Sequence, residues 1–208
     1  MRTNVYVDGF NLYYGAVKDT PYKWLDLAQL CRLLLPGNQI NRIRYFTALV
    51  KSRPKDPGQQ QRQQTYLRAL QTIPNLSIHY GHFLSSRVRM PIANPPTKGP
   101  RTVEVVKTEE KGSDVNLASL MLVDGFRGDY EAAVMISNDS DLQLPIQIVR
   151  SDLALEVGVL NPEPPKRSWV LSKACGFYKP IRAGVLEASQ FPSILRDAGG
   201  TITKPKTW

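Results

Sequence analysis

The stretch that decides the fold is Val134-Met-Ile-Ser-Asn-Asp-Ser-Asp-Leu-Gln-Leu-Pro145. The apolar run over residues 132–136 predicts a short strand that is buried on both faces. Small polar residues follow at 137–141 and are typical of a tight turn that leads into a helix. Asp139 and Asp141 are therefore expected where a strand ends and a helix begins.

The position of these two aspartates matters because an open α/β sheet binds its ligands outside the carboxyl ends of its strands. Two carboxylates at such a place repel each other unless a cation or a shared proton intervenes. We interpret the pair as ligands for a cation. A purely structural interpretation stays open, in which Asp139 caps the helix and Asp141 lies in its first turn, where the helix dipole favours an acid.

Length and composition restrict the class of protein. With 208 residues, of which 42% are hydrophobic, the chain suits one globular domain with a substantial core. No segment approaches the ~20 apolar residues of a membrane span, and the first residues have no signal-peptide pattern, so we expect no membrane association and a cytoplasmic location. The two cysteines, Cys31 and Cys175, are far apart and lack the spacing of a zinc site.

Charge is unevenly distributed along the chain, which has a net charge of +9. Residues 42–68 hold seven Lys and Arg against one acid, and residues 161–208 hold eight against three, whereas residues 113–160 hold two against eight acids. This distribution fits a protein that draws a polyanion onto a basic surface and holds a cation in an acidic region. It also fits an ordinary solvated surface, and charge alone does not decide between the two.

A second junction of strand, acid and helix lies at the start of the chain. An apolar run over residues 4–8 predicts a strand that ends in Asp8, and a helical pattern follows over residues 12–17. Gly9 gives the backbone room to turn and to approach a ligand closely. Asn11 offers a neutral oxygen beside the Asp8 carboxylate. In the structural alternative, Asp8 only forms the turn and Asn11 only caps the helix.

Strands and helices alternate along the remaining chain. Residues 111–114 introduce another helix, with Ser113 expected as its N-cap and Asp114 in its first turn. This alternation predicts a parallel, doubly wound sheet with right-handed crossovers. Further strands are expected over residues 41–50, 76–84 and 153–160, and further helices over residues 27–35, 59–72 and 168–175.

Two basic segments are candidates for contacts with phosphate groups. The loop over residues 51–58 follows an expected strand, and residues 85–107 mix basic residues with prolines. Within the second segment, residues 87–90 and 101–106 are expected to pair as a hairpin, so that the segment forms a projecting basic arm; the alternative is a flexible insertion without a role. The basic residues that we expect to bind RNA are Lys51, Arg53, Lys55, Arg87, Arg89, Lys98 and Arg101.

Three motifs resemble the signature motifs of the NYN domain, a branch of the PIN-like nuclease superfamily, and more narrowly its bacterial LabA/DUF88 group. They are Val5-Tyr-Val-Asp-Gly-Phe-Asn-Leu12, Lys111-Gly-Ser-Asp-Val-Asn-Leu117 and Ser137-Asn-Asp-Ser-Asp-Leu142. The match in order and spacing covers roughly residues 3–160, and residues 186–192 are also similar. The resemblance implies an α/β fold, a Rossmann-like α/β/α sandwich with a central parallel sheet. We expect a nuclease domain at 1–160, with the basic arm at 85–107, and a C-terminal extension at 161–208 that packs on the same domain.

The resemblance also implies a metal site. Asp114 stands where many PIN relatives place Glu, and its shorter side chain leaves open whether it contacts the metal directly. By motif position, Asp8, Asp114, Asp139 and Asp141 would hold one or two Mg²⁺ or Mn²⁺ ions, with Asn11 beside Asp8 and Ser137 hydrogen-bonded within the cluster.

The function expected from these residues is metal-dependent hydrolysis of single-stranded RNA. An all-oxygen ligand set favours a hard cation, and a metal-bound water is easier to deprotonate. One alternative is a PIN-like module that binds RNA or a partner protein without catalysis. Another is a phosphohydrolase of the haloacid-dehalogenase kind, but residues 8–11 lack the second acid of its Asp-x-Asp pair. A homodimer, or a regulatory partner that controls a toxin-type nuclease, is left open.

Overall fold

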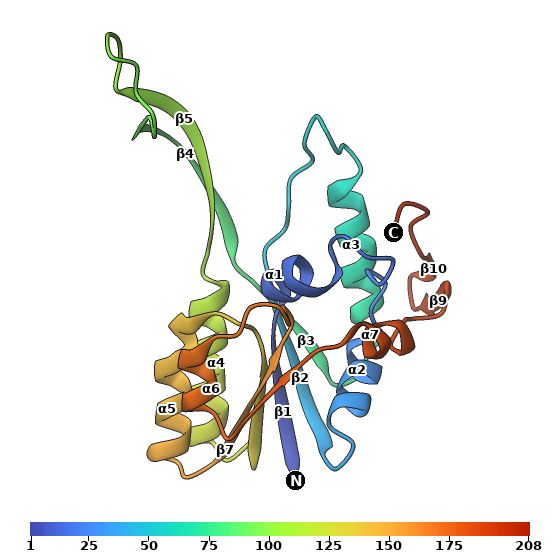
Figure 1. Ribbon diagram of the computed structural model, residues 1–208. Helices are drawn as coiled ribbons and strands as arrows, with labels where there is room; N and C mark the ends of the chain where they lie inside the picture. Colours follow the sequence, from blue (N-terminus) through green and yellow to red (C-terminus); the bar gives the residue numbers. More distant parts are fainter.

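Six parallel strands form the central sheet of the computed structural model, which describes residues 1–208 (Figure 1). The strand order is β3-β2-β1-β6-β7-β8, and every neighbouring pair is parallel. The expected Rossmann-like sandwich with a parallel sheet is therefore confirmed. The strands are β1 (Arg2–Asp8), β2 (Gln39–Thr47), β3 (Leu76–Tyr80), β6 (Ala132–Ile136), β7 (Glu156–Asn161) and β8 (Phe177–Pro180).

Helices cover both faces of the sheet and divide the core in two. Val5 and Val7 of β1 point into a cluster of 24 buried residues on one face, and Tyr6 points into a cluster of 15 on the other. Strands buried on both faces are the rule in parallel sheets. The first cluster includes residues of α1 (Gly9–Leu12), the π-helix η1 (Tyr13–Val17), α2 (Leu27–Leu34), α3 (Gln59–Leu70) and α7 (Ala183–Ala188). The second includes residues of α4 (Ser113–Phe126), the short 3₁₀ helix η2 (Ser140–Leu142), α5 (Gln143–Ser151) and α6 (Trp169–Ala174).

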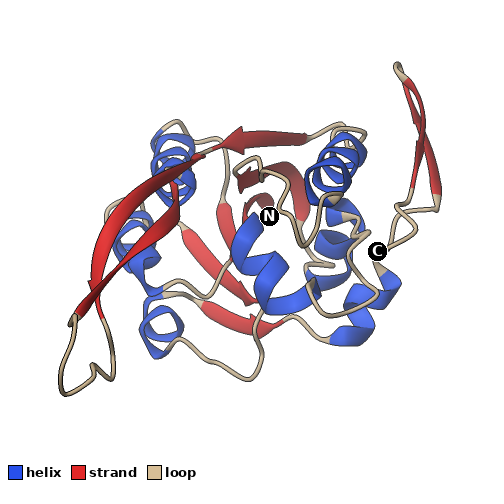
Figure 2. Ribbon diagram, turned by 90° about the horizontal axis from the view of Figure 1, so that it is seen from above, coloured by secondary structure: helices blue, strands red, loops and turns tan.

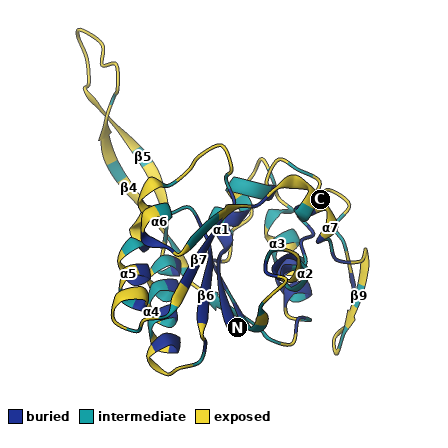
Figure 3. Cartoon of the chain, turned by 60° about the horizontal axis from the view of Figure 1, so that its bottom comes forward, coloured by how far each residue is buried: buried dark blue, intermediate teal, exposed yellow.

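Burial follows the expectation from sequence at the central stretch. All five residues of β6 are buried, and the dark interior of Figure 3 follows the sheet. The turn at residues 137–139 leads into η2 and then α5. No helix of the protein is long and apolar enough to cross a bilayer.

The arm is an antiparallel ribbon of β4 (His82–Pro91) and β5 (Thr102–Lys111) that extends away from the domain (Figures 1 and 2). The expected hairpin is confirmed, because Arg87 pairs with Val106 and Met90 with Val103. The ribbon is longer than the pattern predicted. Its strands are exposed on Figure 3 over most of their length.

The prediction of a single strand over residues 76–84 is wrong, because two strands share this range. The chain leaves the sheet at Gly81, which separates β3 from β4. A Cβ atom at Gly81 would lie 2.2 Å from Glu110 Oε1 and 2.5 Å from the Lys111 carbonyl oxygen. Only glycine fits where the two ends of the arm approach each other so closely.

Ser113 is not the N-cap of α4, as the sequence had suggested. Gly112 occupies that position with a φ of +98°, a conformation that glycine adopts without steric cost. Ser113 is instead the first helical residue, and its hydroxyl donates to Glu110 Oε2 at 2.7 Å. The link between arm and helix is thus made by a side chain of the arm.

Several element boundaries also differ from expectation. β2 ends at Thr47 and not at residue 50, and β7 begins at Glu156 and not at 153. Beyond residue 160 the sheet continues into β8, whose short, partly exposed sequence gave no strand pattern. The tail ends in a hairpin of β9 (Ile194–Asp197) and β10 (Gly200–Thr203) beside α3, where Arg68 of α3 donates two hydrogen bonds to Asp197.

Part of the charge asymmetry is used within the fold. Arg44 of β2 donates to both carboxylate oxygens of Asp124 in α4, at 2.7 and 2.8 Å, and Tyr6 donates to the same carboxylate at 2.8 Å. Arg42 pairs with Asp129 at 3.1 Å. Two acids of the 113–160 region are therefore neutralised by arginines of the 42–68 region, and they tie α4 and the turn after it to the sheet.

Candidate active site

The first and last motifs meet at one edge of the sheet. β1 and β6 are hydrogen-bonded neighbours, with Val7 opposite Ile136, so Asp8 and Ser137 follow the same end of adjacent strands. Asp8 is buried, with 5% of its surface exposed. The carboxyl ends of these strands are where a sheet of this type binds ligands.

Hydrogen bonds fix the orientation of the Asp8 carboxylate. Its Oδ1 accepts from the backbone N–H of Asn11 at 2.9 Å, and its Oδ2 accepts from the Ser137 hydroxyl at 3.1 Å. The Ser137 oxygen in turn accepts from the backbone N–H of Asp139 at 3.1 Å. Ser137 thus connects the ends of the two strands.

Asn11 and Asp139 also have structural tasks. The side-chain oxygen of Asn11 accepts from the backbone N–H of Asn138 at 3.0 Å, so Asn11 binds the turn after β6. Asp139 is the N-cap of η2, and its Oδ1 accepts from the backbone N–H of Asp141 at 3.0 Å. Asp139 therefore has the capping role that the sequence left open. Only its Oδ1 is used for the cap, so its Oδ2 does not take part in this hydrogen bond.

An acidic hollow lies at this edge of the sheet. Asp8, Asp114 and Asp139 line it together with Glu110 of β5, and the one basic residue of its lining is Arg53. Asp141 is exposed and is not part of the lining. Glu110 was missed from the sequence because the expected hairpin strand ended at residue 106, and an acid near the end of a strand is no signal by itself.

Burial and mutual repulsion disfavour the charged forms of Asp8 and Asp114. Burial raises the pKa of Asp8 to about 6, with further contributions from the charges of Asp114 and Asp139, against the lowering effect of the bonds from Asn11 and Ser137. The pKa of Asp114 is also raised, first by burial and then by the charges of Asp139, Glu110 and Asp141. No lysine or arginine forms an ion pair with any of the four aspartates of the motifs.

The donor chemistry of the hollow fits a hard divalent cation, because every acidic group in it offers oxygen. The arrangement is open, since no three Asp, Glu, His or Cys side chains converge into a ready-made ligand group. Binding of an ion would therefore require these side chains to rearrange. Asp8 is held by its hydrogen bonds, so we expect Asp114 of α4 and Asp139 before η2 to move toward it.

The basic residues expected to bind RNA lie at two different places. Arg53 reaches the hollow, while Lys51 and Lys55 are exposed on the same loop. Arg87 lies 3.8 Å from Glu104, so the arm carries both signs of charge. The four basic residues of the arm, Arg87, Arg89, Lys98 and Arg101, are all exposed and do not line the hollow.

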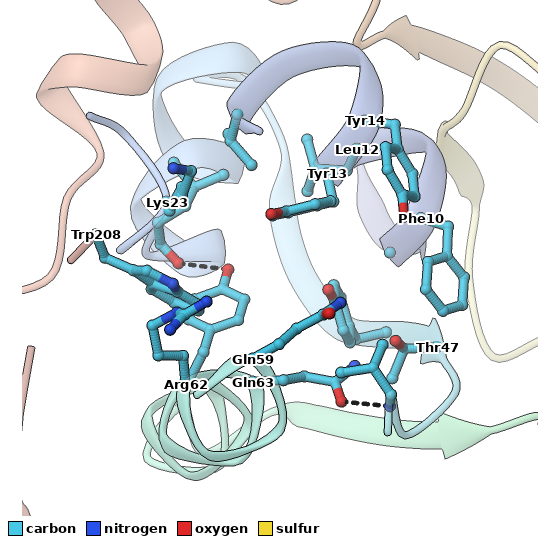
Figure 4. Close-up of a pocket in the computed structure, with 16 residues that line it drawn as sticks. Phe10, Leu12, Tyr13, Tyr14, Lys23, Thr47, Gln59, Arg62, Gln63 and Trp208 are labelled. Atoms are coloured by element: carbon cyan, nitrogen blue, oxygen red, sulfur yellow. Dashed lines mark hydrogen bonds between the residues drawn. The ribbon is translucent and has the colours of Figure 1, made fainter. Parts of the chain in front are cut away.

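An aromatic pocket opens next to the acidic hollow, between η1, the end of β2 and α3 (Figure 4). Phe10, Tyr14, Val50 and Gln59 line both spaces. The sequence gave no sign of this pocket, because its residues come from distant segments, including the C-terminal Trp208.

A doubly wound parallel sheet with acids gathered beyond β1 and β6 defines the PIN-like class of fold. The chain belongs to the NYN domain family, which matches residues 2–182. It is 31% identical to the 6-hydroxy-3-succinoylpyridine 3-monooxygenase HspA of Pseudomonas putida, in an alignment that covers 100% of this chain and 75% of that protein. A crystal structure of a Vibrio parahaemolyticus protein of unknown function resembles the fold with a TM-score of 0.57 at 14% identity, covering 88% of this chain and 93% of the other.

Proposed function

We propose that this protein is a metal-dependent ribonuclease that hydrolyses phosphodiester bonds of single-stranded RNA at the acidic hollow. The observation that carries the proposal is the gathering of Asp8, Asp114 and Asp139 around one open space, without a basic partner for any of them. Carboxylates that repel one another in this way are stabilised by a divalent cation. Membership of the NYN family supports the same reading.

The residues of the hollow divide the work of hydrolysis between them. Asp8, Asp114 and Asp139 would hold Mg²⁺ or Mn²⁺, with Asp141 at the rim. Such an ion, when bound, supplies a water of lowered pKa and neutralises charge on the phosphate. Ser137 and the Asn11 backbone keep the Asp8 carboxylate in place. Arg53 lines the hollow and would contact a phosphate oxygen. The oxygen of a water molecule would bond to phosphorus as the bond from phosphorus to the leaving ribose oxygen breaks, and the proton lost by the water would pass to that ribose oxygen.

Cleavage of labelled single-stranded RNA and DNA, with and without Mn²⁺, tests the proposal. Asp139→Asn and Asp8→Asn should each reduce Mn²⁺-dependent RNA cleavage by roughly a hundredfold or more, because each removes a carboxylate that would hold the cation beside the phosphate. Asp152→Asn, a change of the same type at an exposed acid outside the hollow, should cleave at the wild-type rate. Circular dichroism checks the fold of each variant.

Cleavage by both hollow variants at the wild-type rate would reject this site. RNA that binds but stays intact in the presence of Mn²⁺ would instead support the non-catalytic RNA-binding module.

A second candidate function is oxidation of a small aromatic compound. It is favoured by the activity for which the Pseudomonas putida relative is named, since that relative aligns with the whole chain, and by the aromatic pocket beside the hollow. A monooxygenase places one atom of O₂ in its substrate and reduces the other to water, which takes two electrons from a reductant. Oxygen uptake that depends on both 6-hydroxy-3-succinoylpyridine and a nicotinamide reductant would support this candidate, and no uptake above background would remove it.

A further inference from the structure

The aromatic pocket has the form of a small-molecule site that the proposed cleavage chemistry does not use. Its cavity volume is about 80 Å³, room for several water-sized groups, and the pocket is partly open to solvent. Ten of its 16 lining residues are hydrophobic. Tyr13 and Tyr14 stand on one side and Trp208 on another, as Figure 4 shows.

Two residues of this pocket carry hydroxyl groups that make no hydrogen bond within the protein. Tyr45 and Thr47 lie near the end of β2, with 7% and 2% of their surface exposed, and both line the pocket. None of the hydrogen bonds of the protein involves either hydroxyl, and neither is among its fully buried unpaired atoms, so both are available to a ligand in the pocket. A ligand with polar atoms at its edge would satisfy both.

The remaining walls are already fixed by hydrogen bonds. Gln63 of α3 accepts from the Val50 N–H and donates to the Ala48 carbonyl, both at 2.9 Å, and the Tyr66 hydroxyl donates to the Leu25 carbonyl at 2.9 Å. The Gln63 bonds hold α3 against the segment that follows β2, and the Tyr66 bond holds it against the segment that precedes α2. The walls of the pocket are therefore in place without a ligand. The groups that make these bonds are already paired, so the Tyr45 and Thr47 hydroxyls remain available to a ligand.

The backbone joins the pocket to the acidic hollow. A Cβ atom at Gly9 would lie 2.6 Å from the Phe46 carbonyl oxygen and 2.7 Å from the Tyr45 hydroxyl, so glycine allows α1 to lie against β2. The helix then widens into η1, a π-helix, a rare form that is frequent at functional sites. In η1 the Tyr13 and Tyr14 rings pack edge to face at 5.2 Å. A molecule held at the acids can thus extend into the pocket past Phe10.

We propose that the aromatic pocket binds one planar heteroaromatic ring with hydrogen-bonding atoms on its edge, the base of the nucleotide next to the phosphate held at the acidic hollow. The tyrosine and tryptophan rings provide stacking surfaces that accept any base. The hydroxyls of Tyr45 and Thr47 both donate and accept, and they contact the edge of the ring. The identity of the ring as an RNA base rests on the proposed ribonuclease function, whereas the binding of a ring rests on the pocket.

Calorimetric titration with nucleoside 5′-monophosphates and with ribose 5-phosphate, which lacks a base, tests the proposal. The monophosphates should bind and ribose 5-phosphate should bind much more weakly. Tyr45→Phe and Thr47→Val, which keep size and remove one hydroxyl each, should weaken nucleotide binding by roughly three- to tenfold, the effect of one neutral hydrogen bond. Tyr80→Phe, the same change at an exposed tyrosine outside the pocket, is the matched control and should bind as the wild type does. Thermal unfolding confirms that the variants are folded.

The outcomes separate this proposal from the ribonuclease proposal. Nucleotide binding that depends on the two hydroxyls supports the pocket even if no RNA is cleaved, in which case only the ribonuclease proposal fails. Equal binding of nucleotides and ribose 5-phosphate, or unchanged affinity in both variants, overturns the pocket even if RNA is cleaved. Binding of 6-hydroxy-3-succinoylpyridine without any nucleotide binding overturns the assignment to an RNA base.

Discussion

At the scale of single residues, the most informative group is the Asp8 carboxylate. It is almost completely buried, it faces other acids, and it keeps its position through bonds from Asn11 and Ser137. Burial and the charges of the nearby acids raise its pKa from 3.8 to about 6, against the lowering effect of these two bonds. The folded state is therefore less stable when Asp8 is charged than it would be with a neutral group of the same shape.

Asp8→Asn should stabilise the metal-free protein at about pH 8 by on the order of 1–3 kcal/mol. Because the folded-state pKa lies above the unfolded one, the folded state holds more protons between about pH 4 and pH 6, and wild-type stability falls as the pH rises through this window. The difference between variant and wild type should therefore vanish below about pH 4. Urea unfolding of both proteins in EDTA, at about pH 4 and at about pH 8, measures this difference in the free energy of unfolding. A variant that is no more stable than the wild type at about pH 8 would contradict this account of Asp8.

At the scale of elements, the arm stands out because a two-stranded ribbon alone is marginally stable in water. The register places Val88, Met90, Val103 and Val105 on one face of the ribbon, at alternate positions along β4 and β5. The opposite face carries Arg87 and Arg89 together with Glu104 and other residues. The arm is thus amphipathic. The face that carries Arg87 and Arg89 also carries the acid Glu104, so it is not purely basic.

Replacing Arg87, Arg89 and Arg101 by Gln should weaken binding of single-stranded RNA and reduce the slope of log affinity against log salt by roughly two, if each contacts one phosphate. The change in total charge is controlled by a second triple variant, Arg32→Gln, Arg127→Gln and Lys173→Gln, whose residues are exposed on the body of the domain. This control should retain most of the wild-type slope. Identical slopes for the wild type and the arm variant would exclude the arm from RNA binding.

At the scale of the whole molecule, the core and the candidate site are independent. The two clusters of buried apolar residues lie on the two faces of the sheet, and the acids lie beyond the ends of its strands. The fold is held by apolar burial and by pairs such as Arg44 with Asp124, and none of these contacts uses the acids of the motifs.

Removing divalent metal should therefore abolish cleavage without unfolding the protein. In EDTA we expect a cooperative thermal transition, and Mn²⁺ should raise its midpoint, because a ligand that binds only the folded state stabilises it. Asp139→Asn should lose most of this rise. Loss of the cooperative transition in EDTA would show that metal holds the core together, contrary to the structure.

The sequence predicted the sheet well and the edges of the site less well. β6 was predictable because a parallel strand is buried on both faces and reads as a continuous apolar run. β8 was not, because an edge strand of four partly exposed residues has no such pattern. Asp8 and Asp139 could be expected at the same edge of the sheet because each lies at the end of a predicted parallel strand, and the motif resemblance placed them in one cluster. Glu110 and the pocket around Tyr45 could not, because they depend on where the arm and α3 pack.

Between the last residue of β5 and the first of α4 there is only Gly112. Asp114 is therefore attached to the base of the arm through the first turn of its helix, and Glu110 bonds both the backbone N–H and the hydroxyl of Ser113 across this joint. The position of Asp114 relative to the root of the arm is therefore set by a single residue and by the two hydrogen bonds from Ser113 to Glu110.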